Sequence, residues 1–183
     1  YGNALSNRMT GNALGNWLRG NAGNDTLSGG AGNDTYSFGF GNGQDLIVDE
    51  RSSGDTTART DTLSFDSSVT PADVKLIWSN NTLVVTVGTG GDKVTVEGFK
   101  ISNGVADPLN PIQQIQFYDQ TLWNSAKLVQ MLASAAITGT EQADNLKGGD
   151  SDDLISGLAG NDTLTGNAGN DTLDGGAGID SLI

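Results

Sequence analysis

Aspartate recurs every nine residues in two parts of the chain, in most units two residues after a glycine, as in "GNAGNDTLSGGAGNDTYS" from Gly20 to Ser37. Carboxylates at this spacing, beside turns whose glycines leave backbone carbonyls accessible, form a set of oxygen ligands. The chain has no Cys and no His, which excludes thiolate and imidazole ligands and a histidine-based catalytic triad. An all-oxygen set points to calcium or magnesium, and a flexible, backbone-rich set favours calcium.

The repeated unit can be written G-G-x-G-x-D-x-U-x, where U is a large apolar residue. A short internal period of this kind is typical of a stacked, quasi-one-dimensional fold in which each unit contacts its neighbours. The units form two unbroken blocks. In the first block the units begin at Gly2, Gly11, Gly20 and Gly29, and in the second block they begin at Gly139, Gly148, Gly157, Gly166 and Gly175. The two blocks therefore predict two stretches of one repeated structure.

One large apolar residue per unit, at position eight, is the candidate core. Its neighbours are polar, as in Thr26-Leu27-Ser28 and Thr163-Leu164-Thr165, which is the alternation of a short strand with one buried face. The other six residues of each unit then form the turn. The apolar positions are Met9, Leu18, Leu27, Tyr36, Leu146, Ile155, Leu164, Leu173 and Leu182.

These units resemble those of the repeats-in-toxin (RTX) family, which has a calcium-binding nonapeptide of this pattern. The resemblance covers residues 2–37 and 139–183. It implies that two successive units form one turn of a right-handed parallel β-roll, with calcium between turn loops one coil apart. The position-six side chains and the carbonyls of the glycine-rich turns would hold the ions.

In a roll of this kind, units 18 residues apart share an edge. This spacing predicts three aspartate pairs in the second block, Asp144 with Asp162, Asp153 with Asp171, and Asp162 with Asp180. Without metal the paired carboxylates repel each other across the coil, and a core of one apolar residue per unit is thin. We therefore expect at least the second block to be unfolded without calcium and folded with it.

The first block is expected to bind calcium less well, because Asn7 and Asn16 stand at position six of its opening units. After a slip of two residues, Gly41-Asn42-Gly43-Gln44-Asp45 continues the pattern, so Asp25 is expected to share an ion with Asp45. Asp61-Thr62-Leu63-Ser64 repeats the strand half of the unit without a glycine-rich turn directly before it.

We expect about three to seven Ca²⁺ ions in all. Two structural alternatives accompany this hypothesis: the aspartates could merely cap turns, and the threonines of position seven could form a flat recognition face. The predicted metal ligands are Asp25, Asp34, Asp45, Asp144, Asp153, Asp162, Asp171, Asp180, Gly23, Gly32, Asn24, Asn33, Gly160, Asn161, Gly169, Asn170 and Gly178.

Between the blocks the nonapeptide is lost and strand patterns replace it. We expect strands at 46–48, 62–65, 74–78, 82–87, 93–96, 112–118 and 121–123, and a helix that begins after a cap at Asn124 or Ser125 and ends near Ala135. The stretches "DTLSF", "NNTLVV", "DKVTVEGF" and "IQQIQFYDQTLW" resemble the haemolysin-type calcium-binding-related β domain. This resemblance implies a β-sandwich-like cap that shields the end of the roll.

The predicted fold is therefore all-β, with two right-handed parallel β-roll blocks flanking a β-sandwich-like central domain that carries one short helix. The first block spans residues 1–40, the central segment 41–137 and the second block 138–183.

The central segment also contains acidic side chains that could in principle hydrolyse glycosides as pairs. They lie in polar turns without an accompanying nucleophile, phosphate loop or base, so we predict no catalysis. The tryptophans Trp17, Trp78 and Trp123 could instead line a sugar-binding face, although strand packing explains the last two more simply. The acids concerned are Asp49, Glu50, Asp55, Asp61 and Asp66.

The chain carries a net charge of -13 over 183 residues, which disfavours nucleic acid and anionic membrane surfaces as partners. No apolar run is long enough for a membrane-spanning helix. The RTX resemblance implies type I secretion in an unfolded state, followed by folding in extracellular calcium, as part of a larger secreted bacterial protein. A calcium-dependent carbohydrate-binding or adhesion module is the alternative function.

Overall fold

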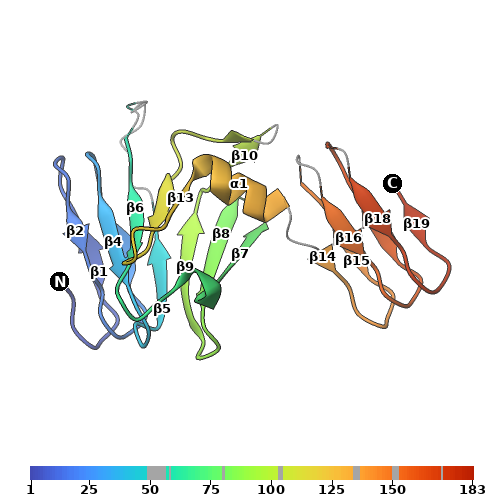
Figure 1. Ribbon diagram of the computed structural model, residues 1–183, viewed down its shortest axis with the longest axis horizontal. Coiled ribbons are helices and arrows are strands. Elements are labelled where there is room, and N and C mark those ends of the chain that lie inside the picture. Colours follow the sequence, from blue (N-terminus) through green and yellow to red (C-terminus); the bar gives the residue numbers. More distant parts are fainter. Residues whose placement is uncertain are drawn as a thin grey trace. The chain divides into compact units, whose positions relative to one another are not determined.

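The computed structural model describes residues 1–48, 57, 59–79, 81–102, 105–133, 137–149, 153–169 and 171–183. These residues form two compact units, which are described one after the other (Figure 1). The first unit comprises residues 1–100 and 106–128, and the second comprises residues 101–105 and 129–183. Both consist mainly of strands, so the predicted all-β class with parallel sheets and one short helix is confirmed.

Two sheets make up most of the first unit. One has six strands in the order β1-β3-β5-β9-β8-β7, and the other has five in the order β13-β12-β6-β4-β2. A 3-10 turn, Pro71–Asp73, precedes β7. The strand bounds are Arg8–Thr10 (β1), Trp17–Leu18 (β2), Thr26–Ser28 (β3), Thr35–Phe38 (β4), Gln44–Ile47 (β5), Thr62–Phe65 (β6), Val74–Ser79 (β7), Thr82–Val87 (β8), Asp92–Glu97 (β9), Gln114–Gln116 (β12) and Leu122–Asn124 (β13).

The nonapeptides of the first block alternate between these two sheets. Strands 18 residues apart pair in parallel, so Met9 lies opposite Leu27 in one sheet and Leu18 lies opposite Tyr36 in the other. Leu18, Leu27 and Tyr36 are buried, whereas Met9, in the first coil, is partly exposed. One apolar residue per unit therefore builds the core of the roll, as the sequence predicts.

Both sheets continue from the first block into the central segment. Strand β5 pairs with β3 and β9 pairs with β5, while β6 pairs with β4 and β12 pairs with β6, all in parallel. The core columns extend through Ile47 and Val96 and through Leu63 and Ile115, each at most 1% exposed. Beyond them the sheets become antiparallel, at β8 and β7 and at β13. The first block and the central segment thus share one hydrophobic core, and the boundaries at 40 and 137 stay predictions.

Most of the strands predicted in the central segment are present. Strands β6 and β8 have the predicted bounds, and β7 and β9 are each slightly longer than predicted. The predicted strand at 112–118 is limited to Gln114–Gln116. A two-stranded sheet of β10 (Ile101–Ser102) and β11 (Val105–Ala106) was not predicted, because two-residue strands leave no periodicity to detect.

The single helix of the described residues, α1, spans Ser125–Ala133. Asn124 caps its start, since its Oδ1 accepts the N–H of Lys127 at 3.0 Å. The predicted end near Ala135 lies outside the described residues. No helix in this described part of the chain combines the length and apolarity needed to span a membrane.

The second unit contains two parallel three-stranded sheets, β14-β16-β18 and β15-β17-β19. Ile155 and Leu164 are fully buried at its centre, whereas Leu146 and Leu173 are partly exposed and Leu182 is 53% exposed. The core of this unit is therefore most tightly closed around Ile155 and Leu164. The strand bounds are Ile137–Thr138 (β14), Asn145–Lys147 (β15), Leu154–Ser156 (β16), Thr163–Thr165 (β17), Thr172–Asp174 (β18) and Ser181–Leu182 (β19).

Candidate metal centre

The position-six aspartates of the second block form a ladder along each edge of the roll. In each rung, one carboxylate oxygen, Oδ1, accepts the backbone N–H of the position-six residue one coil earlier. The N–H groups of Asp144, Asp153 and Asp162 thus donate to Asp162, Asp171 and Asp180 at 2.8, 2.9 and 2.9 Å. The structure brings together all three pairs that the sequence predicts for this block.

The first block builds the same ladder. Asn7 donates its N–H to Asp25 at 2.7 Å, and Asn16 donates to Asp34 at 2.8 Å. Asp25 in turn donates to Asp45 Oδ1 at 3.0 Å, although 20 residues separate the two. The two-residue slip is absorbed in the turn before β5, so the predicted juxtaposition of Asp25 and Asp45 is present.

The second carboxylate oxygen, Oδ2, is buried without a hydrogen-bond partner in four of these aspartates, namely Asp25, Asp34, Asp45 and Asp162. Each of these residues is at most 2% exposed. A buried anionic oxygen without a donor is costly, and protein interiors tolerate it mainly where a cation compensates it. These oxygens fit a hard divalent ion, which is the group that the residue types predict.

The acidic side chains meet in pairs rather than in larger clusters. Among the described residues, no group of three or more carboxylates gathers in a way that could hold a metal. Calcium takes six to eight oxygens. Two carboxylates would therefore supply only part of the coordination shell of a calcium ion, and the other oxygens would have to come from backbone carbonyls of the turns or from water.

The position-four glycines have the backbone geometry that such turns require. Their φ angles lie between +98° and +146°, a region that residues with a Cβ rarely adopt. These five are the predicted site glycines Gly23, Gly32, Gly160, Gly169 and Gly178. In these five turns glycine is thus needed for backbone conformation.

The position-one glycines serve a different purpose from the predicted one. The repeat pattern predicts a positive φ for glycine at position one as well as at positions two and four. The position-one φ angles are not positive, so that part of the prediction is wrong. Instead, a Cβ on Gly20 or Gly157 would collide with Oδ2 of the aspartate five residues later. On Gly157 it would also meet the carbonyl oxygen of Gly175 at 2.6 Å. The absence of a side chain leaves room for the carboxylate.

The position-five asparagines link successive coils. The side-chain oxygens of Asn24, Asn33 and Asn161 accept backbone N–H groups of the next coil at 3.1, 3.0 and 2.9 Å. Their backbone carbonyls are the groups to consider as ligands, and this role stays a prediction. The remaining predicted asparagine, Asn170, lies outside the described residues.

Charge is distributed unevenly around the ladder aspartates of the first unit. Burial raises the pKa of Asp45 to about 7, and the negative charges of Asp25 and Asp92 add to the effect. Burial also raises the pKa of Asp34, but a backbone N–H from Asn16 and the charge of Arg59 oppose it. The two positions therefore differ in whether a protein cation lies nearby.

Two aspartates at these edges were not among the predicted ligands. Asp61 Oδ1 accepts the N–H of Asp34 at 2.8 Å, and Asp92 accepts the N–H groups of Gly41 and Gly43, both at 2.8 Å. For Asp61, the only signal in the sequence was the strand half of the repeat, Asp61-Thr62-Leu63-Ser64. Nothing in the repeat pattern points to Asp92, which begins strand β9.

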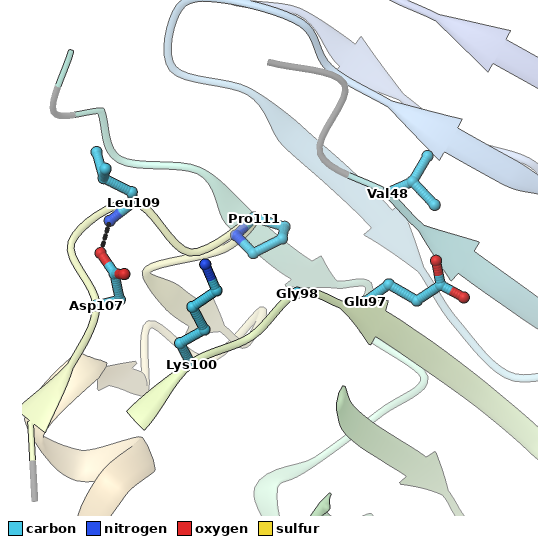
Figure 2. Close-up of a pocket in the computed structure, with 7 residues that line it drawn as sticks. All are labelled: Val48, Glu97, Gly98, Lys100, Asp107, Leu109 and Pro111. Atoms are coloured by element: carbon cyan, nitrogen blue, oxygen red, sulfur yellow. Dashed lines mark hydrogen bonds between the residues drawn. The ribbon is translucent and has the colours of Figure 1, made fainter. Parts of the chain in front are cut away.

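A pocket of about 450 Å³ lies in the first unit (Figure 2). Its charged lining residues are Glu97, Lys100 and Asp107. Asp107 Oδ1 accepts the N–H of Leu109 at 2.8 Å, and Glu97 points away from Asp107. The two carboxylates of this pocket therefore do not point toward each other. A pair of carboxylates that hydrolyses a glycosidic bond would have to flank the same bond.

The remaining candidate acids have structural partners or are not described. Asp66 forms a salt bridge with Arg19 at 3.0 Å. Burial acts to raise the pKa of Asp66, but hydrogen bonds from Ser68 and Arg19 outweigh it and lower the pKa. Asp49, Glu50 and Asp55 lie outside the described residues.

The repeated ladder defines a protein built from metal-binding nonapeptide coils, and comparison with known families identifies the class. The model of the RTX calcium-binding nonapeptide repeat matches residues 1–45, 137–163 and 147–182. The haemolysin-type calcium binding protein related domain matches residues 83–127. The chain belongs to the RTX family of haemolysin-type calcium-binding repeat proteins.

Comparison with curated proteins gave no match. Among solved structures, the extracellular lipase LipA from Serratia marcescens aligns with 20% identity and a TM-score of 0.37. The alignment covers 99% of this chain and 28% of the lipase chain, so the present chain spans little more than a quarter of that protein's length.

Proposed function

We propose that this chain is a non-catalytic calcium-binding module of a larger secreted protein, and that calcium folds its second block after export. The observation that carries this proposal is the ladder of aspartates with buried, unpartnered Oδ2 atoms. Calcium would supply the positive charge that neutralises facing carboxylates.

In the second block, the pairs Asp144/Asp162, Asp153/Asp171 and Asp162/Asp180 would hold ions together with backbone carbonyls of the turns. In the first unit, Asp25 of the first block and Asp45 of the central segment would form an equivalent pair. Only the folded roll places these residues side by side, so a ligand that binds there stabilises the folded state.

The second block depends on the ion for two reasons. Its core is thin, because Ile155 and Leu164 are the large side chains that it buries fully. It is also strongly acidic, and Lys147 is its single cationic residue. Hydrophobic burial and internal charge pairing are therefore both weak there.

Dependence on calcium would couple folding to location. Type I secretion exports chains in an unfolded state, and the calcium concentration is low in the cytosol and high outside the cell. A module that is unfolded without calcium would remain exportable and would fold only after it leaves the cell. The acidic, cysteine-free composition is compatible with this route.

A calcium titration followed by far-UV circular dichroism tests the proposal, with magnesium as the ion control. We expect a cooperative gain of β structure with calcium that shifts to higher concentration in the Asp162→Asn, Asp171→Asn variant. Asp174→Asn is the matched control, because this exposed aspartate of β18 lies outside the ladder. A full β spectrum in chelator, unchanged by calcium, would refute the folding role.

Carbohydrate binding is the second candidate function, and one observation favours it. Trp17 is 58% exposed on strand β2 and could stack on a sugar ring. The other tryptophans do not extend such a face, since Trp123 is buried and Trp78 Nε1 donates to the carbonyl of Phe99 at 2.9 Å. Tryptophan fluorescence of wild type and Trp17→Ala during titration with a series of oligosaccharides would test it.

A further inference from the structure

The Asp34 ladder, which runs from Asn16 through Asp34 to Asp61, does not end on a carboxylate. Asp34 donates its N–H to Asp61 Oδ1 at 2.8 Å, and Asp61 donates its own N–H to Gln113 Oε1 at 2.6 Å. The parallel pairing of β6 with β12 starts one residue after Asp61 and one residue after Gln113, so these two residues lie opposite each other. Gln113 therefore stands where the next coil would carry its position-six residue, and it brings a neutral amide to that place.

The second polar atom of the Gln113 side chain has the opposite hydrogen-bonding character from that of a ladder aspartate. Its Nε2 donates to the backbone carbonyls of Pro108 and Asn110, in the turn before β12. In Asp34 the second atom is an oxygen, Oδ2, which is buried without a donor. An ionised carboxylate only accepts hydrogen bonds, whereas an amide accepts through its oxygen and donates through its nitrogen. Because the Asp61 N–H needs an acceptor and the two carbonyls need a donor, the surrounding groups fix which way the amide lies.

The turn that leads to Gln113 is held by protein groups. Asn110 is 1% exposed, and its Oδ1 accepts the N–H of Lys100 at 2.7 Å while its Nδ2 donates to the carbonyl of Lys100 at 3.0 Å. In a calcium-binding turn, the inward carbonyls would contribute to the coordination shell of the ion. Here two carbonyls of the turn face the amide N–H groups of Gln113 instead. The turn thus has a donor for these carbonyls without a metal ion.

The other ladder of the first unit also ends without a carboxylate at this level. The pairing of β5 with β9 aligns Asp45 with Val94, which is 1% exposed and has an apolar side chain. Strands β9 and β12 each occupy the fourth place in their sheets, counted from β1 and from β2. Both ladders therefore stop at the same step of the stack, and only the Asp34 ladder stops on a polar side chain.

We infer that Gln113 is the terminal cap of the Asp34 ladder and closes the last turn of this edge in place of a calcium ion. An ion between Asp61 and Gln113 would find one carboxylate instead of two, and the amide N–H groups would point into the turn where its carbonyl ligands should be. The roll is thereby joined to β12 on this edge without calcium. The inference rests on the proposed calcium-binding function and specifies where along the roll calcium binding ends.

The first test converts the cap into a carboxylate in the full chain. Gln113→Glu keeps Oε1 as the acceptor for the Asp61 N–H and replaces the donor with a second oxygen, which faces the carbonyls of Pro108 and Asn110. Calcium bound per chain is measured by equilibrium dialysis with radioactive calcium at saturation. We expect Gln113→Glu to bind one more ion than wild type, and to lose that ion again when Asp61→Asn is added.

Gln116→Glu is the matched control, because it adds the same charge to the same strand but lies opposite Ser64 rather than opposite a ladder aspartate. It should retain the wild-type ion count. An unchanged count in Gln113→Glu, an equal gain in Gln116→Glu, or retention of the added ion after Asp61→Asn would each overturn the role of Gln113, while calcium binding by the wild-type chain would stand. A wild-type chain that binds no calcium would overturn the proposed function itself.

The second test uses the wild-type chain and does not depend on the folding of a variant. Amide hydrogen exchange is measured residue by residue by NMR in chelator and in saturating calcium. The Asp61 amide should be equally protected in both conditions, since its acceptor is Gln113, whereas the Asp162 amide, which donates to Asp180 in the second block, should be protected only in calcium. Loss of Asp61 protection in chelator would overturn the inference. Full protection of Asp162 in chelator would contradict the proposed function alone.

Discussion

The two repeat blocks use one motif but are stabilised differently. In the first unit, the apolar columns of the roll continue into the central segment through Ile47 and Val96 and through Leu63 and Ile115. In the second unit, the last coil ends at Leu182, which is 53% exposed. The comparison teaches that the same nonapeptide gains a different amount of hydrophobic stabilisation according to what lies next to it.

Aromatic packing strengthens the first unit further. Phe65 lies 5.2 Å from Phe117 between ring centroids, and Phe117 lies 4.7 Å from Trp123. These side chains come from β6, the segment after β12, and β13, so they tie the end of the roll to the antiparallel strand beside it. The described residues of the second block have no aromatic side chain. Their stability must come from other sources, of which calcium is the one we propose.

Removal of calcium should give the largest difference between the two units. In chelator we expect the second block to lose its structure while the strands of the first unit persist, because only the first has a substantial core. Hydrogen exchange read by mass spectrometry would resolve the two, with amides of β15 to β18 exchanging freely and those of β8 and β9 remaining protected. Equal loss of protection in both units would show that calcium supports them alike.

A core truncation at the centre of the second block should have the next largest effect. Leu164 is fully buried, and Leu164→Ala should cost about 2–5 kcal/mol in the calcium-bound state, which is enough to shift calcium-induced folding to much higher concentration. Leu182→Ala is the matched control, since Leu182 occupies the same repeat position one coil later but is half exposed. Calcium titrations followed by circular dichroism would compare them. Similar effects at the two positions would mean that the last coil is buried in solution.

A glycine substitution probes the space reserved for the carboxylate. Gly157→Ala would place a methyl group against Asp162 Oδ2 and the Gly175 carbonyl, so it should weaken calcium binding without changing the charge of the chain. Gly90→Ala is the control, because its added methyl would approach only Asp92 Oδ2, at 3.9 Å. Isothermal titration calorimetry would measure the calcium affinity of both. Wild-type affinity in Gly157→Ala would show that the carboxylate can move aside at little cost.

The sequence is sufficient to predict the ladder wherever the period is kept. The fixed spacing of 18 residues places Asp144 beside Asp162, and the short slip before Asp45 can be counted. Prediction fails where a longer insertion intervenes, as between Asp34 and Asp61, because spacing no longer indicates which residues share an edge.

The position-one glycines illustrate a second limit. Their recurrence shows that a side chain is excluded, but it cannot tell a positive φ from a close approach by another group. In Gly20 the cause is the Asp25 carboxylate, which occupies the volume of a Cβ, whereas in Gly23 the cause is a φ of +125°. Only the folded structure shows which of these two causes, a close approach by a carboxylate or a positive φ, applies to a given glycine.

The smallest expected effect concerns the ion pair at the edge of the first unit. Arg19, after β2, and Asp66, after β6, form a salt bridge at 3.0 Å with side chains 30% and 31% exposed. Solvent screens a pair this exposed, so Arg19→Gln should cost about 0.5 kcal/mol in urea unfolding of the first unit. The second block, which has no such pair among its described residues, should show no change in its calcium titration.

The pH dependence of this pair follows from the lowered pKa of Asp66. Because the folded-state pKa lies below the ordinary value, the stabilisation is fully present above the ordinary carboxyl pKa and is lost as pH falls through the folded-state value. Arg19→Gln and wild type should therefore differ in unfolding free energy at pH 7 and converge at the acidic end, where Asp66 is protonated in both. A difference that persists in acid would indicate that Arg19 stabilises the edge by packing of its aliphatic stem rather than by its charge.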